Sequence, residues 1–218
     1  MKITFYGHAC LSIETGSSIV LVDPFITGNP NAAHINIASI KADYILLTHA
    51  HQDHILDAEA IAKNTGAVIV SNYEIASHYG AKGFSYHPMN HGGSWKFDFG
   101  TVRFVNAIHT SSFPDGSYGG NPMGFIINST DGVFYYSGDT ALTLDMQLIP
   151  RWGKPKFSVL PIGDNFTMDV ADAIACADMI QCNTILGVHY NTFGYIVIDT
   201  TEAKAAFAAA GKTLLLPG

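Results

Sequence analysis

Short apolar runs separated by turn residues open the chain. They have the length and β-branched content of strands, and a Thr-Gly turn precedes the last of them: ITFY (3–6), CLSIE (10–14) and SIVLV (18–22). A second set of the same kind, with an Asp-Gly turn between its members, returns later as MGFIIN (123–128) and VFYY (133–136). The sequence therefore predicts strand hairpins at corresponding places in its two halves.

The correspondence between the halves extends beyond these hairpins. Asp23 and Asp139 each follow the turn glycine of their hairpin by seven residues. Each half then continues with an apolar run, a polar loop, a helical pattern and another strand-like run. In the first half these are YILLTHAHQDH (44–54) and AEAIAKNTGAVIVSN (58–72). In the second half they are FSVLPIGDNFT (157–167) and ADAIACADMIQCNTILGVHYN (171–191). This pattern indicates an internal duplication of a strand-rich unit that adds helices.

Each of the two halves has an apolar sheet face to bury. If these faces pack against each other, the helices lie outside, so we predict an α/β fold, a four-layer αββα sandwich that forms one domain over residues 1–218. The end of the chain fits this plan. Asp199 can cap a helix that Gly211 ends, and TLLLP (213–217) is a closing strand.

Charge and composition narrow the choice of function. Lys and Arg total 11 against 18 Asp and Glu, a net charge of −7, so the chain lacks the basic surplus that binds nucleic acid. Only 13% of residues are charged, which indicates that part of the surface contacts other chains. The sequence has no signal-peptide pattern and no run long enough to span a membrane. We expect a cytoplasmic homo-oligomer that binds neither nucleic acid nor membranes.

The densest candidate chemistry is THAHQDH (48–54), directly after an apolar run. Side chains at alternating positions of an extended segment point the same way, so His49 and His51 can converge on one ion. Asp53 and His54 stand where a helix can begin, directed toward a second point. Imidazoles with a carboxylate suit zinc, and also manganese or iron. The alternative is a solvated polar loop.

Three further polar residues each stand just past an apolar run: His109, Asp139 and His189. Alone, each would more often be a structural residue than a metal ligand. In a sandwich, however, all of them can gather with THAHQDH at one edge of the sheets. The combination therefore favours a metal centre.

These motifs resemble the metallo-β-lactamase superfamily across essentially the whole chain. The segments GHACLSIE, DPFITGNP, LPIGDNFTM and VHYNTF are similar to those of the small metal-dependent hydrolases related to ascorbate-phosphate lactonase. The resemblance implies two divalent metal ions, zinc in the first place and manganese or iron as alternatives. It also implies their ligands: His49, His51 and His109 for one ion, Asp53, His54 and His189 for the other, and Asp139 as the bridge.

The reaction implied is hydrolysis of a small molecule, whether a lactone, an amide, a thioester or a phosphoester. Two ions lower the pKa of a shared water from ~15.7 toward neutrality, which makes the bridging hydroxide the nucleophile. Asp53 is the candidate catalytic residue that directs its proton to the leaving group. A competing hypothesis is a catalytically idle metal-binding oligomer or regulatory module of the same fold, for which metal content without turnover is expected.

The roles of the residues around the predicted centre stay open at this stage. Substrate binding or support of the ligands is predicted for His8, Asp23, Asp164, Asn165 and Thr167. For Asp23 the alternative is a turn cap, and for His8 a structural role. His87 and His91 fit the entrance, an oligomer contact or an ordinary surface. Aromatic residues near the motifs form either a pocket wall or plain core: Phe25, Phe166, Tyr190 and Phe193.

Overall fold

Two mixed β-sheets form the centre of the molecule. The structure, a computed structural model, describes residues 1–217. The first sheet has the order β1 (Lys2–Gly7), β2 (Cys10–Thr15), β3 (Ser18–Val22), β4 (Tyr44–Leu46), β5 (Val68–Asn72) and β6 (Tyr86–Met89). The second has the order β13 (Thr213–Leu215), β12 (Thr184–Val188), β11 (Phe157–Pro161), β10 (Gly132–Tyr136), β9 (Met123–Ser129), β8 (Gly100–Asn106) and β7 (Ser94–Phe97).

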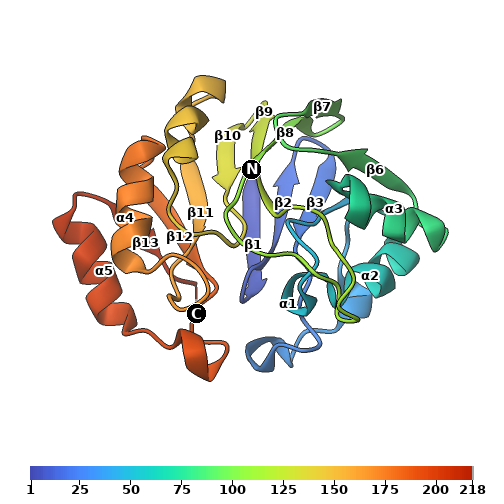
Figure 1. Ribbon diagram of the computed structural model, residues 1–218, viewed down its shortest axis with the longest axis horizontal. Coiled ribbons are helices and arrows are strands. Elements are labelled where there is room, and N and C mark those ends of the chain that lie inside the picture. The colour runs from blue at the N-terminus through green and yellow to red at the C-terminus, as the bar shows by residue number, and fades with distance from the viewer. Residues whose placement is uncertain (218) are drawn as a thin grey trace.

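Helices cover the outer face of each sheet, which gives the four predicted layers (Figure 1). The first sheet is covered by α1 (Gln52–Ile55), α2 (Ala58–Thr65) and α3 (Tyr73–Ala81), and the second by α4 (Val170–Met179) and α5 (Thr200–Ala209). The last helix begins where the sequence predicted, because the Asp199 carboxylate accepts hydrogen bonds from the backbone of Thr201 and Glu202. Among the described residues, no helix has the length and apolar character needed to cross a membrane.

Alternation along the strands explains why both faces of each sheet are buried. In β3, Val20 and Val22 belong to the core between the two sheets, whereas Leu21 belongs to the core beneath the helices of its own half. The second sheet behaves alike, with Phe134 and Tyr136 facing the inner core and Tyr135 the outer one. Because side chains alternate in a strand, one apolar run serves both layers.

The predicted internal duplication has a counterpart in the topology. Strands β1 to β3 are antiparallel and β3 to β6 are parallel, and the second sheet repeats this order with β8 to β10 antiparallel and β10 to β13 parallel. The extra strand β7 pairs with β8 in a stretch where the apolar pattern is weak. Corresponding strands therefore end at the same edge of the sandwich, the lower edge in Figure 1, where α1 lies.

Candidate metal centre

The predicted ligands leave the carboxyl ends of strands at this shared edge. His49 and His51 follow β4, His109 follows β8, Asp139 follows β10 and His189 follows β12. His51 has extended backbone angles (φ −65°, ψ 146°), and α1 begins directly after it. The first turn of α1 then presents Asp53 and His54 to the same point. Sequence-distant residues thus meet because the parallel strands end together.

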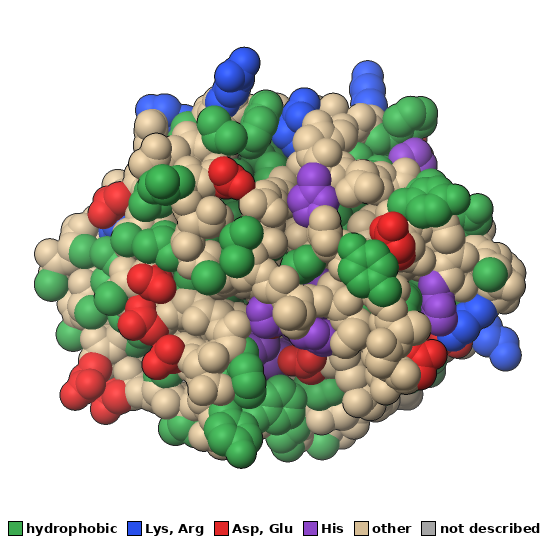
Figure 2. Space-filling view, in the orientation of Figure 1, with side chains coloured by type: hydrophobic (Ala, Val, Ile, Leu, Met, Phe, Trp, Pro, Cys, Tyr) green, Lys and Arg blue, Asp and Glu red, His purple; other side chains and the backbone are tan. Residues whose placement is uncertain are grey.

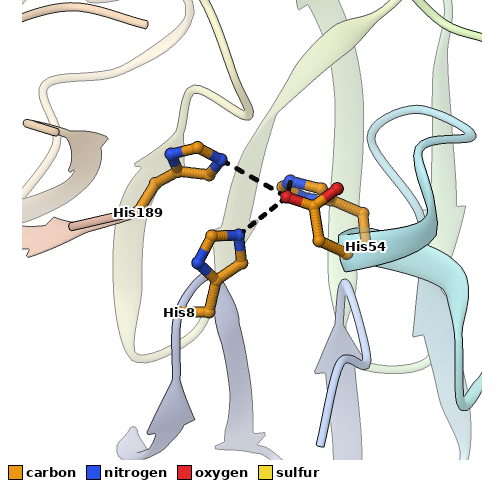
Figure 3. A group of neighbouring side chains, drawn as sticks. His8, His54 and His189 are labelled. Atoms are coloured by element: carbon orange, nitrogen blue, oxygen red, sulfur yellow. Dashed lines mark hydrogen bonds and ion pairs between the residues drawn. The ribbon is translucent and has the colours of Figure 1, made fainter. Parts of the chain in front are cut away.

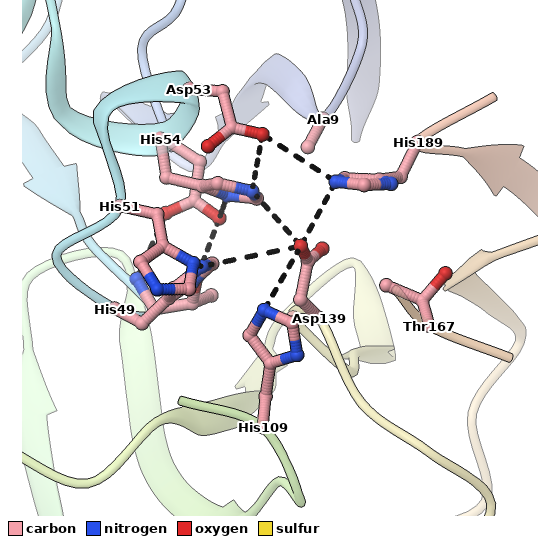
Figure 4. Close-up of polar contacts among 12 residues, drawn as sticks. Ala9, His49, His51, Asp53, His54, His109, Asp139, Thr167 and His189 are labelled. Atoms are coloured by element: carbon pink, nitrogen blue, oxygen red, sulfur yellow. Dashed lines mark hydrogen bonds and ion pairs between the residues drawn. The ribbon is translucent and has the colours of Figure 1, made fainter. Parts of the chain in front are cut away.

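Asp139 lies at the middle of the cluster (Figure 4). Its Oδ2 is 3.0 Å from His189 Nε2 and 3.3 Å from His54 Nε2. The same oxygen is 3.8 Å from His109 Nε2 and 4.0 Å from His49 Nε2. One buried carboxylate oxygen therefore faces imidazole nitrogens from both halves of the chain.

The donor atoms fall into groups whose members lie within 4.8 Å of one another. One group consists of His49, His51 and His109, and another of His8, Asp53, His54 and His189. A third, His49, His54 and Asp139, joins the first two. This division matches the two predicted ligand sets, with His8 as an addition.

Asp23 fixes a proton on Nδ1 of two predicted ligand histidines. Its carboxylate accepts a hydrogen bond from His54 Nδ1 at 2.9 Å and one from the Thr48 hydroxyl at 2.7 Å. Since that hydroxyl donates to Asp23, it accepts from His49 Nδ1, 2.9 Å away. Both rings therefore hold a proton on Nδ1, and both Nε2 atoms point into the cluster.

This arrangement fits a metal ion. Within residues 1–217, His54 Nε2 is a buried nitrogen without a hydrogen-bond partner, and it faces the Asp139 carboxylate. A neutral ring would present its Nε2 lone pair to that carboxylate, so a second ring proton or a metal ion has to lie between the two groups. Leaving a buried polar atom unsatisfied costs about 1–3 kcal/mol. A cation between the two groups removes this penalty, and imidazole with carboxylate is a donor set for zinc, manganese or iron.

The ionisation of the cluster follows from burial and charge. Burial lowers the pKa of His49 well below its usual range. Burial also lowers the pKa of His54, but the Asp139 and Asp53 carboxylates outweigh it and raise that pKa well above the usual range. Burial alone would raise the pKa of Asp139, but the charges of His189 and His54 hold that pKa well below the ordinary value. The carboxylates are thus ionised and need positive charge beside them, from ring protons or from a metal.

His8 contacts a predicted ligand rather than standing free in the cleft (Figure 3). Its Nε2 lies 2.9 Å from Asp53 Oδ2, its Nδ1 lies 3.0 Å from Thr192 Oγ1, and its ring centroid is 4.3 Å from that of His189. Its backbone is left-handed, with φ 55°, which is uncommon for a residue with a side chain. Other non-glycine residues at this edge share that conformation: Asp23, Asp164, Asn165, His189 and Asn191. Such local strain typically gathers at functional sites.

A cavity of about 660 Å³ opens onto the donor groups. Polar or ligand residues form its base, and apolar ones form its walls: His51, Gln52, Asp53, His109, Thr110, Asp139 and His189 below, and Phe25, Gly28, Leu56, Phe166 and Phe193 around them. The predicted wall role thus fits Phe25, Phe166 and Phe193. The volume falls in the range of small-molecule sites.

The loop after β11 reaches the cavity through Phe166, and the substrate or ligand contacts predicted for Asp164, Asn165 and Thr167 stay predictions. Phe166 lines the cavity, whereas Asp164 and Asn165 are exposed and Asp164 Oδ1 accepts a hydrogen bond from the Asn165 backbone. Thr167 is half-buried near Asp139 in Figure 4, and its hydroxyl donates to the Met168 carbonyl. Consecutive left-handed residues at Asp164 and Asn165 turn the chain so that the aromatic side chain faces inward.

His87 and His91 lie on the segment around β6 and β7, away from the cavity lining. The His87 ring packs against Trp95 and Phe97, with centroids 4.8 and 5.0 Å away. His91 Nε2 contacts the Pro122 carbonyl at 2.8 Å. Both rings therefore have local structural partners.

Comparison with known proteins places this geometry in a family. A model described as beta-lactamase superfamily domain matches residues 2–189. The chain belongs to the beta-lactamase superfamily. A UPF0173 metal-dependent hydrolase of Flavobacterium johnsoniae is 64% identical over 99% of this chain and 96% of its own length. One from Bacillus mycoides is 42% identical, over 91% of this chain and 89% of the relative.

Solved structures agree with this assignment. Igni18, described as a novel metallo hydrolase from the archaeon Ignicoccus hospitalis, is 33% identical with a TM-score of 0.89, over 99% of this chain and 94% of that one. Together with its relatives, the chain belongs to the UPF0173 metal-dependent hydrolases. The predicted superfamily, fold and enzyme class are thereby confirmed. The narrower resemblance to ascorbate-phosphate lactonase stays a prediction.

Several supporting residues were not among the predicted ones. Asp23 Oδ2 accepts hydrogen bonds from the hydroxyls of Thr48 and Tyr136, the latter at 3.1 Å. His8 Nδ1 is hydrogen-bonded to the Thr192 hydroxyl. Thr48 directly precedes His49, and Tyr136 ends the strand before Asp139, so both are close in sequence to predicted ligands. Only the folded chain reveals their bonding partners.

Asp23→Asn is expected to weaken metal binding about 10–100-fold, the usual effect of removing a residue that orients a ligand. The amide has the same shape but provides one acceptor oxygen where the carboxylate provides two. The His54 and His49 tautomers are then no longer fixed. Competition with a chromophoric chelator measures the affinity, and thermal unfolding verifies the fold. A folded variant with unchanged affinity would refute the orienting role.

Proposed function

We propose that the protein hydrolyses a lactone, amide, thioester or phosphoester bond in a small molecule with the help of two divalent ions. Zinc is the first choice of metal, and manganese or iron are the alternatives. The observation that carries this proposal is the position of Asp139 Oδ2. It lies 3.3 Å from His54 Nε2 in one donor group and 4.0 Å from His49 Nε2 in the other.

The two donor groups support the predicted assignment of residues to the ions. His49, His51 and His109 would bind one ion, Asp53, His54 and His189 the other, and Asp139 would contact both. Divalent ions at such a centre supply Lewis acidity, which lowers the pKa of water from ~15.7 toward 7 and polarises the oxygen of the bond to be cleaved. The remaining steps fall to side chains of the chain itself.

Asp53 is the group best suited to move a proton. Both Asp53 and Asp139 line the cavity, but the Asp53 side chain is 26% exposed whereas that of Asp139 is buried. Burial acts to raise the pKa of Asp53, but the charge of His54 and hydrogen bonds from His189 and His8 hold that pKa well below the ordinary value, so the carboxylate is ionised. An ionised carboxylate that borders the cavity can accept a hydrogen bond from water and direct that proton toward the leaving atom.

The idle-module alternative is disfavoured by the shape of the site. Structural metal sites are closed, whereas catalytic ones leave an open position. Here a cavity of about 660 Å³ reaches the donor residues. The proposal is tested by metal analysis of protein purified without chelators, followed by turnover assays of esters, lactones, amides, thioesters and phosphodiesters. About two ions per chain with metal-dependent turnover supports it, and metal without turnover on all of these classes favours the idle module.

His8→Asn is expected to lower kcat/KM about 10–100-fold, since the ring that holds Asp53 and packs on His189 is lost. Asparagine is one of the few residues that accept the left-handed backbone of this position, so the turn itself is kept. Gln181→Asn is the matched control, because Gln181 has the same φ of 55° but lies beyond α4. Steady-state kinetics at saturating metal compare kcat/KM of the two variants. If both variants lost the same factor in kcat/KM, or neither lost any, the positioning role of His8 would be contradicted.

A further inference from the structure

Aromatic and aliphatic side chains surround the mouth of the cavity. The rings of Phe25 and Phe193 lie 6.1 Å apart, and each packs against His8, at 5.5 and 5.2 Å. Leu56 and Phe166 stand in the same wall. In Figure 2 apolar side chains lie along the rim of the hollow in which the histidines are visible. The base of the site is therefore polar and its walls are apolar.

Parts of this wall stay in contact with solvent. Phe166 is 50% exposed, Phe193 and Leu56 are each 37% exposed, and the Tyr195 ring, 6.1 Å from that of Phe166, extends the apolar rim. Exposed apolar surface around a concave site typically marks where an apolar ligand binds. An apolar ligand group that covers these rings removes them from water.

The charges of the cavity point the same way. Among the described residues that line it, none is Lys or Arg, and its acidic groups, Asp53 and Asp139, belong to the metal donor set. The uncharged polar residues in the base of the cavity are Gln52 and Thr110. Proteins bind phosphate and carboxylate groups with Arg or Lys, and burying an anion without such a partner is costly. A charged group on the substrate remote from the scissile bond has no partner in this site.

We propose that the substrate is an uncharged small molecule with an aromatic or branched apolar arm. This inference rests on the proposed hydrolase function. The scissile bond lies over the donor groups, and the arm packs between the Phe25–Phe193 pair and Phe166. The cavity of about 660 Å³ accommodates a phenylalkyl arm together with the reacting group. A sugar phosphate, with its anion away from the scissile bond, does not fit this chemistry.

Three 4-nitrophenyl esters that share the same leaving group and differ in their acyl group test the proposed apolar arm. They are the phenylacetate, the acetate and the hydrogen succinate. On the zinc- or manganese-loaded enzyme we expect kcat/KM for the phenylacetate to exceed that for the acetate about tenfold or more, as burial of a phenyl ring implies. The succinate monoester is expected to fall below the acetate. Equal or faster turnover of the anionic ester would overturn the proposal while leaving the hydrolase function intact.

Variants of the apolar cavity wall test whether its side chains cause the preference for the phenylacetate. Phe166→Ala is expected to remove most of the preference for the phenylacetate over the acetate, measured as the ratio of the two kcat/KM values. Tyr73→Ala, which truncates an aromatic residue 61% exposed at the start of α3, is the control and should preserve the preference. Leu56→Arg is expected to improve the succinate ester selectively. If Phe166→Ala instead alters only the oligomeric state and keeps the ester preference, the rim is a contact between copies of this chain and the proposal fails.

A binding measurement separates this inference from the hydrolase function. Ligand-observed NMR compares 3-phenylpropionamide with its ring-sulfonated counterpart on the metal-loaded protein. Binding of the neutral probe alone, weakened by Phe166→Ala, supports the inference even if no ester is hydrolysed. Equal binding of both probes, or binding of the sulfonate alone, would overturn it.

Discussion

Asp139→Asn is expected to lower kcat/KM by at least ~10³-fold and to reduce the metal content of the protein. The Asp139 carboxylate is 3% exposed and lies between the donor groups, and its pKa well below the ordinary value means that it contributes a full negative charge. An amide has the same shape but no charge to hold a cation. Loss of the several kcal/mol that a metal contributes to the transition state corresponds to this factor. Elemental analysis and steady-state kinetics measure the two effects.

Asp98→Asn is the matched control for this variant. Asp98 is an exposed carboxylate that precedes β8, at the opposite end of the strand from His109, and accepts a hydrogen bond from Tyr44. It undergoes the same chemical change without contact to the donor groups, so metal content and kcat/KM should equal those of the unmodified protein. If Asp139→Asn retained full metal and activity, the assignment of Asp139 to both ions would be wrong.

That the predicted ligands lie together at one edge was predictable from the sequence, because each of them follows a strand end. A polar residue directly after an apolar run, as at His109 or His189, marks where a strand leaves the core. The duplicated pattern then indicated that these ends share one edge. The sandwich itself was predictable for the same reason, since runs such as SIVLV must bury both faces. Position along the chain thus carried most of the information about the centre.

The supporting contacts were not predictable, because they join residues that are far apart in sequence. His8 meets Thr192 across 184 positions, and Tyr136 meets Asp23 across 113. Their pairing depends on how the two sheets stack, which no local pattern encodes. The loop after β11 shows a related limit. The sequence did not reveal that a left-handed turn at Asp164 and Asn165 directs Phe166 into the cavity, and substrate contacts of the polar loop residues stay a prediction. The oligomeric state and the cytoplasmic location stay predictions.

Metal removal is expected to lower the stability of the fold by several kcal/mol, because the proposed ions would bind groups that are buried in the folded chain. His49 and His54 are fully buried and Asp139 nearly so, and without metal the carboxylates depend on ring protons for positive charge. A ligand at 1,000 times its Kd stabilises the folded state by about 4 kcal/mol per site. For a chain of this size that corresponds to a rise in Tm of roughly 8–16 °C.

Calorimetry of chelator-dialysed protein, before and after addition of zinc or manganese, measures this shift. Magnesium is the control ion, because it prefers an all-oxygen octahedral site and should restore little of the loss. Asp139→Asn provides a second comparison, since a chain that has lost the carboxylate between the donor groups gains less from added zinc. Identical Tm values with and without zinc would mean that the buried imidazoles and carboxylates satisfy one another. The centre would then contribute to the fold as a hydrogen-bonded cluster rather than as a metal site.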